Sequence, residues 1–146
     1  MKTRIDQAIK DAMRAGDQVT RQTLRLVMAA IKQSEVDNKI TLDDNAIFSI
    51  LQKEVRTRNE SMDDAKKADR SDLIQELEEE INVLQKFLPE EIDDEALIEM
   101  VKAAVAEVGA ESPADMGKVM KILLPRVQGQ ASGSRISQAV RSLLQN

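Results

Sequence analysis

The sequence contains neither cysteine nor histidine. Without cysteine there is no disulfide, thiolate nucleophile or thiolate metal ligand, which fits a reducing compartment such as the cytoplasm. Without histidine the chain lacks the commonest general base and the commonest transition-metal ligand, so a Ser–His–Asp or Cys–His catalytic arrangement cannot be built. We therefore predict no metal site and no other cofactor.

Aromatic residues are nearly absent, with two Phe and no Trp or Tyr in 146 residues. Phe48 and Phe87 both fall on apolar helix faces, so stacking of single-stranded bases on exposed rings is not expected. The remaining apolar residues form no run of signal-peptide or membrane-spanning length. We expect a soluble, cytoplasmic protein that does not enter a membrane.

Apolar residues recur at the three- and four-residue spacing of helices, and no segment alternates as a strand does. The spacing predicts an all-α fold, with an N-terminal helical bundle over residues 1–89 and a small three-helix lobe over residues 90–146. Pro89 and the capping residue Asp93 mark the boundary, and Pro125 is expected to break or kink a helix before a loop over residues 126–133. The predicted helices begin near Thr3, Thr20, Thr41, Asp69, Asp93, Ser112 and Ser134.

Basic residues collect near the end of an otherwise acidic chain. Residues 112–146 carry a net +4 with Asp115 as their only acid, and since the whole chain is −5, residues 1–111 carry −9. An anionic partner should meet the basic end, although surface cations can also serve only to keep a small lobe soluble. Glycines are also concentrated there, and glycine allows close approach to the backbone. The predicted nucleic-acid contacts are Lys118, Lys121, Arg126, Arg135, Arg141, Gly117, Gly129 and Gly133.

Two segments resemble a metal-binding or a phosphate-binding motif, but each lacks residues that the motif requires. The acidic run at 76–80 lacks the histidine at i+3 that carboxylate metal bundles use. Gly117 and Lys118 resemble the end of a phosphate loop, but Ser112 replaces its first glycine, Val119 follows the lysine, and no strand precedes it. We predict no catalytic residue.

Several segments resemble the GatB/YqeY family, and its free-standing YqeY-type members in particular. They are the stretch from Arg21 to Arg25, EVRTRNESMDDAKKADRSDLIQELEEEINVLQKFLPEEI, and VGAESPADMGKVMKILLPRVQGQASG. The similarity covers essentially the whole chain. Its most specific part is DMGKVM with the following Pro125 and Gly129; Arg58, Glu60, Ser61, Ala68, Arg70, Asp72, Leu88 and Pro89 add to it.

The resemblance implies an all-helical bundle followed by a small C-terminal helical lobe. Related domains are appended to the GatB and GatE subunits of glutamine-dependent tRNA amidotransferases, and to some glutaminyl-tRNA synthetases, where they grip tRNA away from the chemical centre. The resemblance therefore implies a non-catalytic, tRNA-binding accessory protein, with tRNA and an amidotransferase or aminoacyl-tRNA synthetase as partners. DNA is not expected as a partner. Free-standing members carry the label of a carbon–nitrogen ligase with glutamine as amido donor, although they lack the kinase and amidase machinery.

One loop departs from the family pattern. It commonly reads K-V-K-G-K-A-D-G, whereas Gln128, Gln130 and Ser132 replace two lysines and the acid here, which implies weaker binding of phosphate. Two alternatives stay open. One is a protein-interaction module that docks a partner on the Leu73–Leu88 seam or on the acidic helices. The other is an enzyme acting on a carbon–nitrogen bond through Ser132 or Ser134, although a turn and a helix cap explain both serines.

Overall fold

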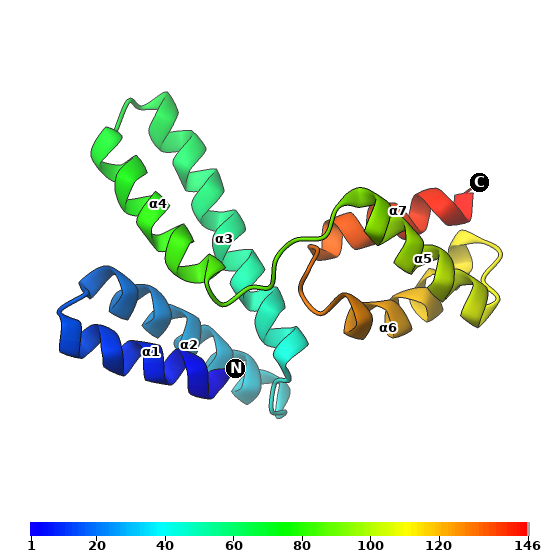
Figure 1. Ribbon diagram of the computed structural model, residues 1–146, viewed down its shortest axis with the longest axis horizontal. Coiled ribbons are helices and arrows are strands. Elements are labelled where there is room, and N and C mark those ends of the chain that lie inside the picture. Colours follow the sequence, from blue (N-terminus) through cyan, green and yellow to red (C-terminus); the bar gives the residue numbers. More distant parts are fainter. Residues whose placement is uncertain (146) are drawn as a thin grey trace. The chain divides into compact units, whose positions relative to one another are not determined.

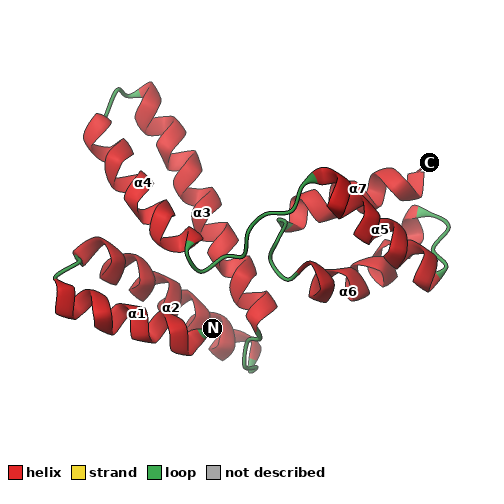
Figure 2. Cartoon of the chain, in the orientation of Figure 1, coloured by secondary structure: helices red, strands yellow, loops and turns green. Residues whose placement is uncertain are grey.

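The computed structural model describes residues 1–145. Within that range the chain forms seven α-helices and one short 3-10 helix, and no strand (Figure 2). The expected all-α fold is therefore confirmed. The helices form two compact units, one spanning Met1–Leu88 and the other beginning at Pro89.

Two antiparallel helix pairs make up the first unit (Figure 1). The first pair is α1 (Lys2–Ala15) and α2 (Gln18–Asn38), and the second is α3 (Asp44–Lys67) and α4 (Ser71–Gln85). Gly16 ends α1 as predicted, because its φ of 70° lies in the left-handed region that glycine adopts without strain. Both pairs contribute to one apolar core, formed by Ile5, Ile9, Leu24, Val27, Ile31, Ile47, Leu51, Val83, Leu84 and Phe87.

Three α-helices and the 3-10 helix make up the second unit. They are α5 (Asp94–Val108), η1 (Pro113–Asp115), α6 (Met116–Val127) and α7 (Gly133–Gln145). The predicted cap at Asp93 is confirmed, since its Oδ1 accepts a hydrogen bond from the amide of Ala96 at 2.8 Å. Each of the three α-helices packs against the other two, around Leu97, Val101, Ala104, Val119, Leu123, Val127, Ala131, Ile136, Val140 and Leu144.

Three of the predicted helix starts in the first unit are wrong. The second helix begins at Gln18 instead of Thr20, and its cap is Asp17, whose Oδ1 accepts a hydrogen bond from the amide of Thr20 at 3.1 Å. Thr41 does not open α3; Asp43 does, and its Oδ1 accepts a hydrogen bond from the amide of Ala46 at 2.9 Å. The fourth helix begins at Ser71 instead of Asp69, because Asp69 has a φ of 54° and so reverses the chain after α3. Asp and Asn tolerate this conformation better than other residues with a Cβ, so an acid can end a helix as well as begin one.

Two predictions near the C-terminal end are also wrong. Pro125 does not break α6, which continues past it, so the loop covers residues 128–132 only. Because proline has no N–H, the carbonyl of Lys121 lacks its usual amide partner, but both residues are exposed and that oxygen can bond water. The cap of α7 is Ser132 instead of Ser134: its hydroxyl accepts a hydrogen bond from the amide of Arg135 at 3.2 Å.

Candidate nucleic-acid interface

The outer face of α6 carries two of the predicted contact residues. Lys118 and Lys121 are exposed, on the side of α6 opposite the fully buried Val119 and Leu123. The Nζ of Lys118 lies 3.8 Å from Asp115 Oδ1, in a pair that water screens and that contributes little to stability. The side chain of Lys121 has no ion pair or hydrogen bond to any residue in the range 1–145. This face of α6 therefore presents positive charge that the protein leaves largely uncompensated.

Gly117 lies on the same exposed face, in the first turn of α6. Its backbone is helical and does not have a positive φ, and an added Cβ would meet no atom within 4 Å. Glycine at such a position costs about 0.5–1 kcal/mol of stability relative to alanine. Nothing in the described part of the chain requires this glycine, so the space above it is open to another molecule.

Arg126 and Arg135 lie elsewhere, because both reach acids at the ends of α5. Arg126 Nη2 is 2.6 Å from Glu107 Oε2. Arg135 Nη2 donates to the backbone oxygen of Ile92 at 3.0 Å and to Asp94 Oδ1 at 2.8 Å. These two arginines fasten α6 and α7 to α5 and to the segment before it, so much of their charge is already matched.

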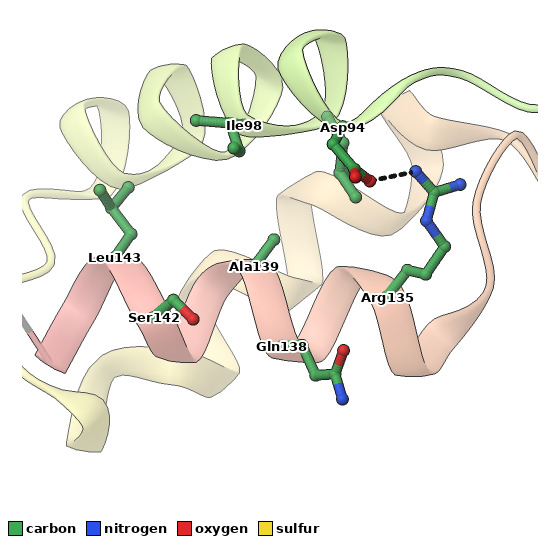
Figure 3. A pocket seen from close by; sticks show the side chains of 8 residues that line it. Asp94, Ile98, Arg135, Gln138, Ala139, Ser142 and Leu143 are labelled. Carbon is green, nitrogen blue, oxygen red and sulfur yellow. Dashed lines mark hydrogen bonds and ion pairs between the residues drawn. The ribbon is translucent and has the colours of Figure 1, made fainter.

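An apolar groove lies beside Arg135, between α5 and α7. Figure 3 shows Ile98 of α5 and Leu143 and Ala139 of α7 lining it, with the Asp94–Arg135 ion pair closing one end. Its volume is about 420 Å³. The groove places Arg135 on the side of α7 that faces α5.

Arg141 lies on a different side of α7. It is six residues beyond Arg135, which is about 120° round the helix from the groove. Its side chain is exposed and has no ion pair within residues 1–145. Helices α6 and α7 pack against each other and run in opposite directions (Figure 1). We call Gly117, Lys118, Lys121 and Arg141 the α6/α7 cationic surface.

The loop between α6 and α7 is held by the fold. Gly129 has a φ of 80°, and Gln128 before it a φ of 50°, so the tight turn itself accounts for this glycine. The amide of Ile92 donates to the oxygen of Gln130 at 3.0 Å, which ties the loop to the segment before α5. Gly133 is the first residue of α7 and is exposed, with open space around its Cα. Only Gly117 and Gly133 thus lack an evident role in the fold.

Residues 112–146 are basic, but the unit to which they belong has a net negative charge. The unit that begins at Pro89 contains six Lys and Arg against nine Asp and Glu, a net charge of −3. The positive lobe suggested by residues 112–146 is therefore corrected: acids from residues 90–111 belong to the same unit, and two of them, Asp94 and Glu107, pair with predicted contact residues. Charge counted along the chain missed this, because these partners are far apart in sequence.

Asp115 organises the start of α6. Its Oδ2 accepts a hydrogen bond from the amide of Glu111 at 3.0 Å. That bond is the main reason why the pKa of Asp115 lies below its usual range; the amide of Ser112 and the charge of Lys118 add to the effect, and slight desolvation opposes it. Asp115 is therefore ionised at neutral pH and remains available to Lys118.

The described part of the chain contains neither a metal-binding cluster nor a membrane-spanning helix. Across residues 1–145, no group of three or more Asp or Glu side chains is placed to hold a metal ion. No helix in that range is long and apolar enough to cross a bilayer. The described residues form two helical units, and the last two helices of the second unit carry the α6/α7 cationic surface.

Comparison with known sequences agrees with the resemblance described above. The chain belongs to the family of Yqey-like proteins, whose family model matches residues 2–144. It is 25% identical over 144 residues to a Pyrenophora tritici-repentis protein named altered inheritance of mitochondria protein 41, mitochondrial; the match covers 97% of this chain and 79% of that protein. It is 30% identical over 152 residues to the Eremothecium gossypii protein of the same name, covering 96% of this chain and 78% of the relative.

Proposed function

We propose that the protein is a non-catalytic accessory factor that binds tRNA through the α6/α7 cationic surface, in association with glutamine-dependent tRNA amidation. The observation that carries this proposal is Gly117, which the fold does not require, lying on the same exposed helix face as Lys118 and Lys121. A glycine without neighbours lets a phosphate backbone come close to the helix, and the lysines supply the opposite charge.

Membership of the Yqey-like family supports the choice of tRNA, because the related GatB tail domains are understood to bind it. The proposal narrows the predicted contact set to the α6/α7 cationic surface. Arg126 and Arg135 become positioning residues, since they hold α6 and α7 against α5. The cytoplasmic location is part of the proposal, and the mitochondrial names belong to the relatives alone.

A salt titration tests the proposal. With about three phosphate contacts, the logarithm of the tRNA affinity should fall against the logarithm of salt concentration with a slope of roughly −2 to −3. Changing Lys118→Glu together with Lys121→Glu should abolish binding. The matched control is Lys53→Glu with Arg56→Glu, which reverses two exposed cations at the same spacing on α3 and should leave binding unchanged. Unchanged binding by the α6 variant would falsify the assignment.

Gly117 offers a second test, because substitutions there separate folding from binding. Gly117→Leu should fold at least as well as the wild type, since leucine is the better helix former by roughly 0.8 kcal/mol. It should nevertheless weaken tRNA binding at least about tenfold by filling the space above α6. Thermal unfolding and a tRNA titration on the same sample measure both effects. A variant that keeps full affinity would show that the glycine is not a contact.

The alternative of a protein-interaction module loses one of its expected surfaces. Leu77 and Ile81 are 8% exposed and Leu84 is fully buried, so most of the Leu73–Leu88 seam is used in packing the first unit. Most of this seam is therefore not accessible to a partner.

A further inference from the structure

A second groove lies in the first unit, between α1 and α2. Its volume is about 440 Å³, and its apolar lining, here called its floor, consists of Ile9, Met13, Met28 and Ala29. Its charged lining, here called its rims, consists of Lys10, Arg25, Lys32 and Asp6. We call it the α1/α2 groove. It shares no residue with the α6/α7 cationic surface.

Helix geometry explains how these residues meet. On α2, Arg25, Met28 and Lys32 follow at intervals of three and four, so they lie along one stripe. On α1, Lys10 and Met13 are three residues apart and face that stripe, because the two helices run antiparallel (Figure 1). The distance from Arg25 to Lys32 along α2 is about 10 Å, or two helical turns.

The positive charge around the groove is not neutralised. The side chains of Lys10 and Lys32 make no ion pair or hydrogen bond within residues 1–145. Within residues 1–145 the Arg25 guanidinium makes one weak contact, from Nη2 to Met13 Sδ at 4.0 Å. Asp6 on the rim pairs with none of them. Three free cations thus border an apolar floor in which Met13 is 52% exposed.

We propose that the α1/α2 groove binds an acidic amphipathic helix of another protein. Two turns of such a helix would match the groove in length, with apolar side chains at i, i+3, i+4 and i+7 on the methionines. Unbranched thioethers adapt to varied apolar surfaces. Its carboxylates would lie opposite Lys10, Arg25 and Lys32, which supply the complementary charge.

Other occupants fit the groove less well. A second copy of this chain cannot offer its acidic helix α4, because Leu77 and Ile81 on the apolar face of α4 are only 8% exposed. For nucleic acid, the groove has no aromatic side chain on which a base could stack, and its apolar floor has no group that could bind a phosphate. A bilayer would meet the carboxylate of Asp6 together with the cations, and the groove has no aromatic side chain to anchor it there.

The probe for this proposal is a synthetic, fluorescein-labelled peptide of about 18 residues, long enough for five helical turns. It carries Leu at i, i+3, i+4 and i+7 and Glu on both flanks. Titrated with the full chain, it should bind with a Kd on the order of tens of micromolar. The methyl NMR signals of Met13 and Met28 should shift, and those of Met100, Met116 and Met120 in the second unit should not.

Lys10→Glu combined with Lys32→Glu should weaken peptide binding at least about tenfold through like-charge repulsion. The control pair Lys53→Glu with Arg56→Glu should not change it, and the methionine methyl spectrum reports whether each variant is folded. The groove variant should bind tRNA like the wild type, so the outcome is independent of the proposed function.

Four results would overturn the groove proposal. The first is no binding of the peptide at about 1 mM, which is weaker than any useful docking site. The second is an equal loss of binding in the control pair, which would reduce the effect to overall charge. The third is equal binding of a scrambled peptide of the same composition. The fourth is a groove variant that loses tRNA and retains the peptide.

Discussion

Both units use arginine side chains to join helices, and Arg58 in the first unit lies in different surroundings from Arg135 in the second. Arg58 of α3 is 8% exposed; its Nη1 is 2.6 Å from Glu54 Oε2, and its Nε is 3.2 Å from Glu80 Oε2 on α4. The Arg135 side chain in the second unit is 29% exposed, and its partner Asp94 is 87% exposed. The Arg58 ion pairs therefore lie largely in the interior of the first unit, whereas the Arg135 ion pair lies at the surface of the second.

The difference shows that the surroundings of an arginine or lysine, and not its residue type, decide whether its charge is available to another molecule. A charge that has been taken out of water must keep its partners, because removing one leaves the others buried and unmatched. A charge at the rim can exchange its partner for water at little cost. Lys121 and Arg141 have no partner within the described residues and are the most available of the predicted contact residues.

The largest effect is expected from Arg58→Met. It should lower the free energy of unfolding by about 3 kcal/mol, because Glu54 and Glu80 would remain half-buried without their counter-ion. Urea unfolding gives the magnitude, and hydrogen exchange should show lost protection in α3 and α4 with α5 to α7 unaffected. Adding Glu54→Leu and Glu80→Leu should restore much of the loss. A cost under about 1 kcal/mol for the single variant would remove the contrast with Arg135.

A smaller effect is expected from the matched change in the second unit, Arg135→Met. The exposed ion pair contributes little, so the loss is mainly the hydrogen bond to the Ile92 oxygen, about 1 kcal/mol. The same urea and exchange measurements apply, with protection falling near Ile92 and the start of α7. Arg135→Lys should recover only part of the loss, because lysine lacks the forked donor. A cost equal to that of Arg58→Met would contradict the surface assignment.

The smallest effect is a dependence on pH. The pKa of Asp115 is lower in the folded chain than in the unfolded one, so its contribution is present at pH values above the unfolded pKa of about 4. That contribution is lost as the pH falls through the folded pKa. Thermal midpoints of the wild type and Asp115→Asn, measured from pH 7 down to pH 3, should therefore converge at the acid end. A gap that stays constant would show that the carboxylate charge is not involved.

Much of the fold is predictable from local chemistry. Asp93 caps a helix because a carboxylate just before an apolar periodic run satisfies the first free amides, and Gly16 ends one because it adopts positive φ freely. The prediction that a helix breaks at Pro125 was wrong. The rule is local, but near the end of a helix and at an exposed position the oxygen that loses its amide partner can bond water instead, so the helix continues.

The candidate site was less predictable, because pairing depends on tertiary neighbours. Arg126 meets Glu107, 19 residues away, and Arg135 meets Asp94, 41 residues away, and no spacing rule reports either contact. One side of the α1/α2 groove can be seen in the sequence, in the three- and four-residue spacing of Arg25, Met28 and Lys32. That signal is the ordinary one of an amphipathic helix edge, and only the opposing Lys10 and Met13 turn it into a groove.

The proline within α6 bears on whether a bound nucleic acid would carry ribose or deoxyribose. Because Pro125 has no amide hydrogen, the Lys121 carbonyl cannot accept the usual bond from the residue four positions on, and both residues are exposed. A ribose 2′-hydroxyl can donate to such an oxygen while the adjoining phosphate meets the lysine, and deoxyribose has no hydroxyl there. Under the proposed function, such a contact would favour an RNA strand over a DNA strand of the same sequence.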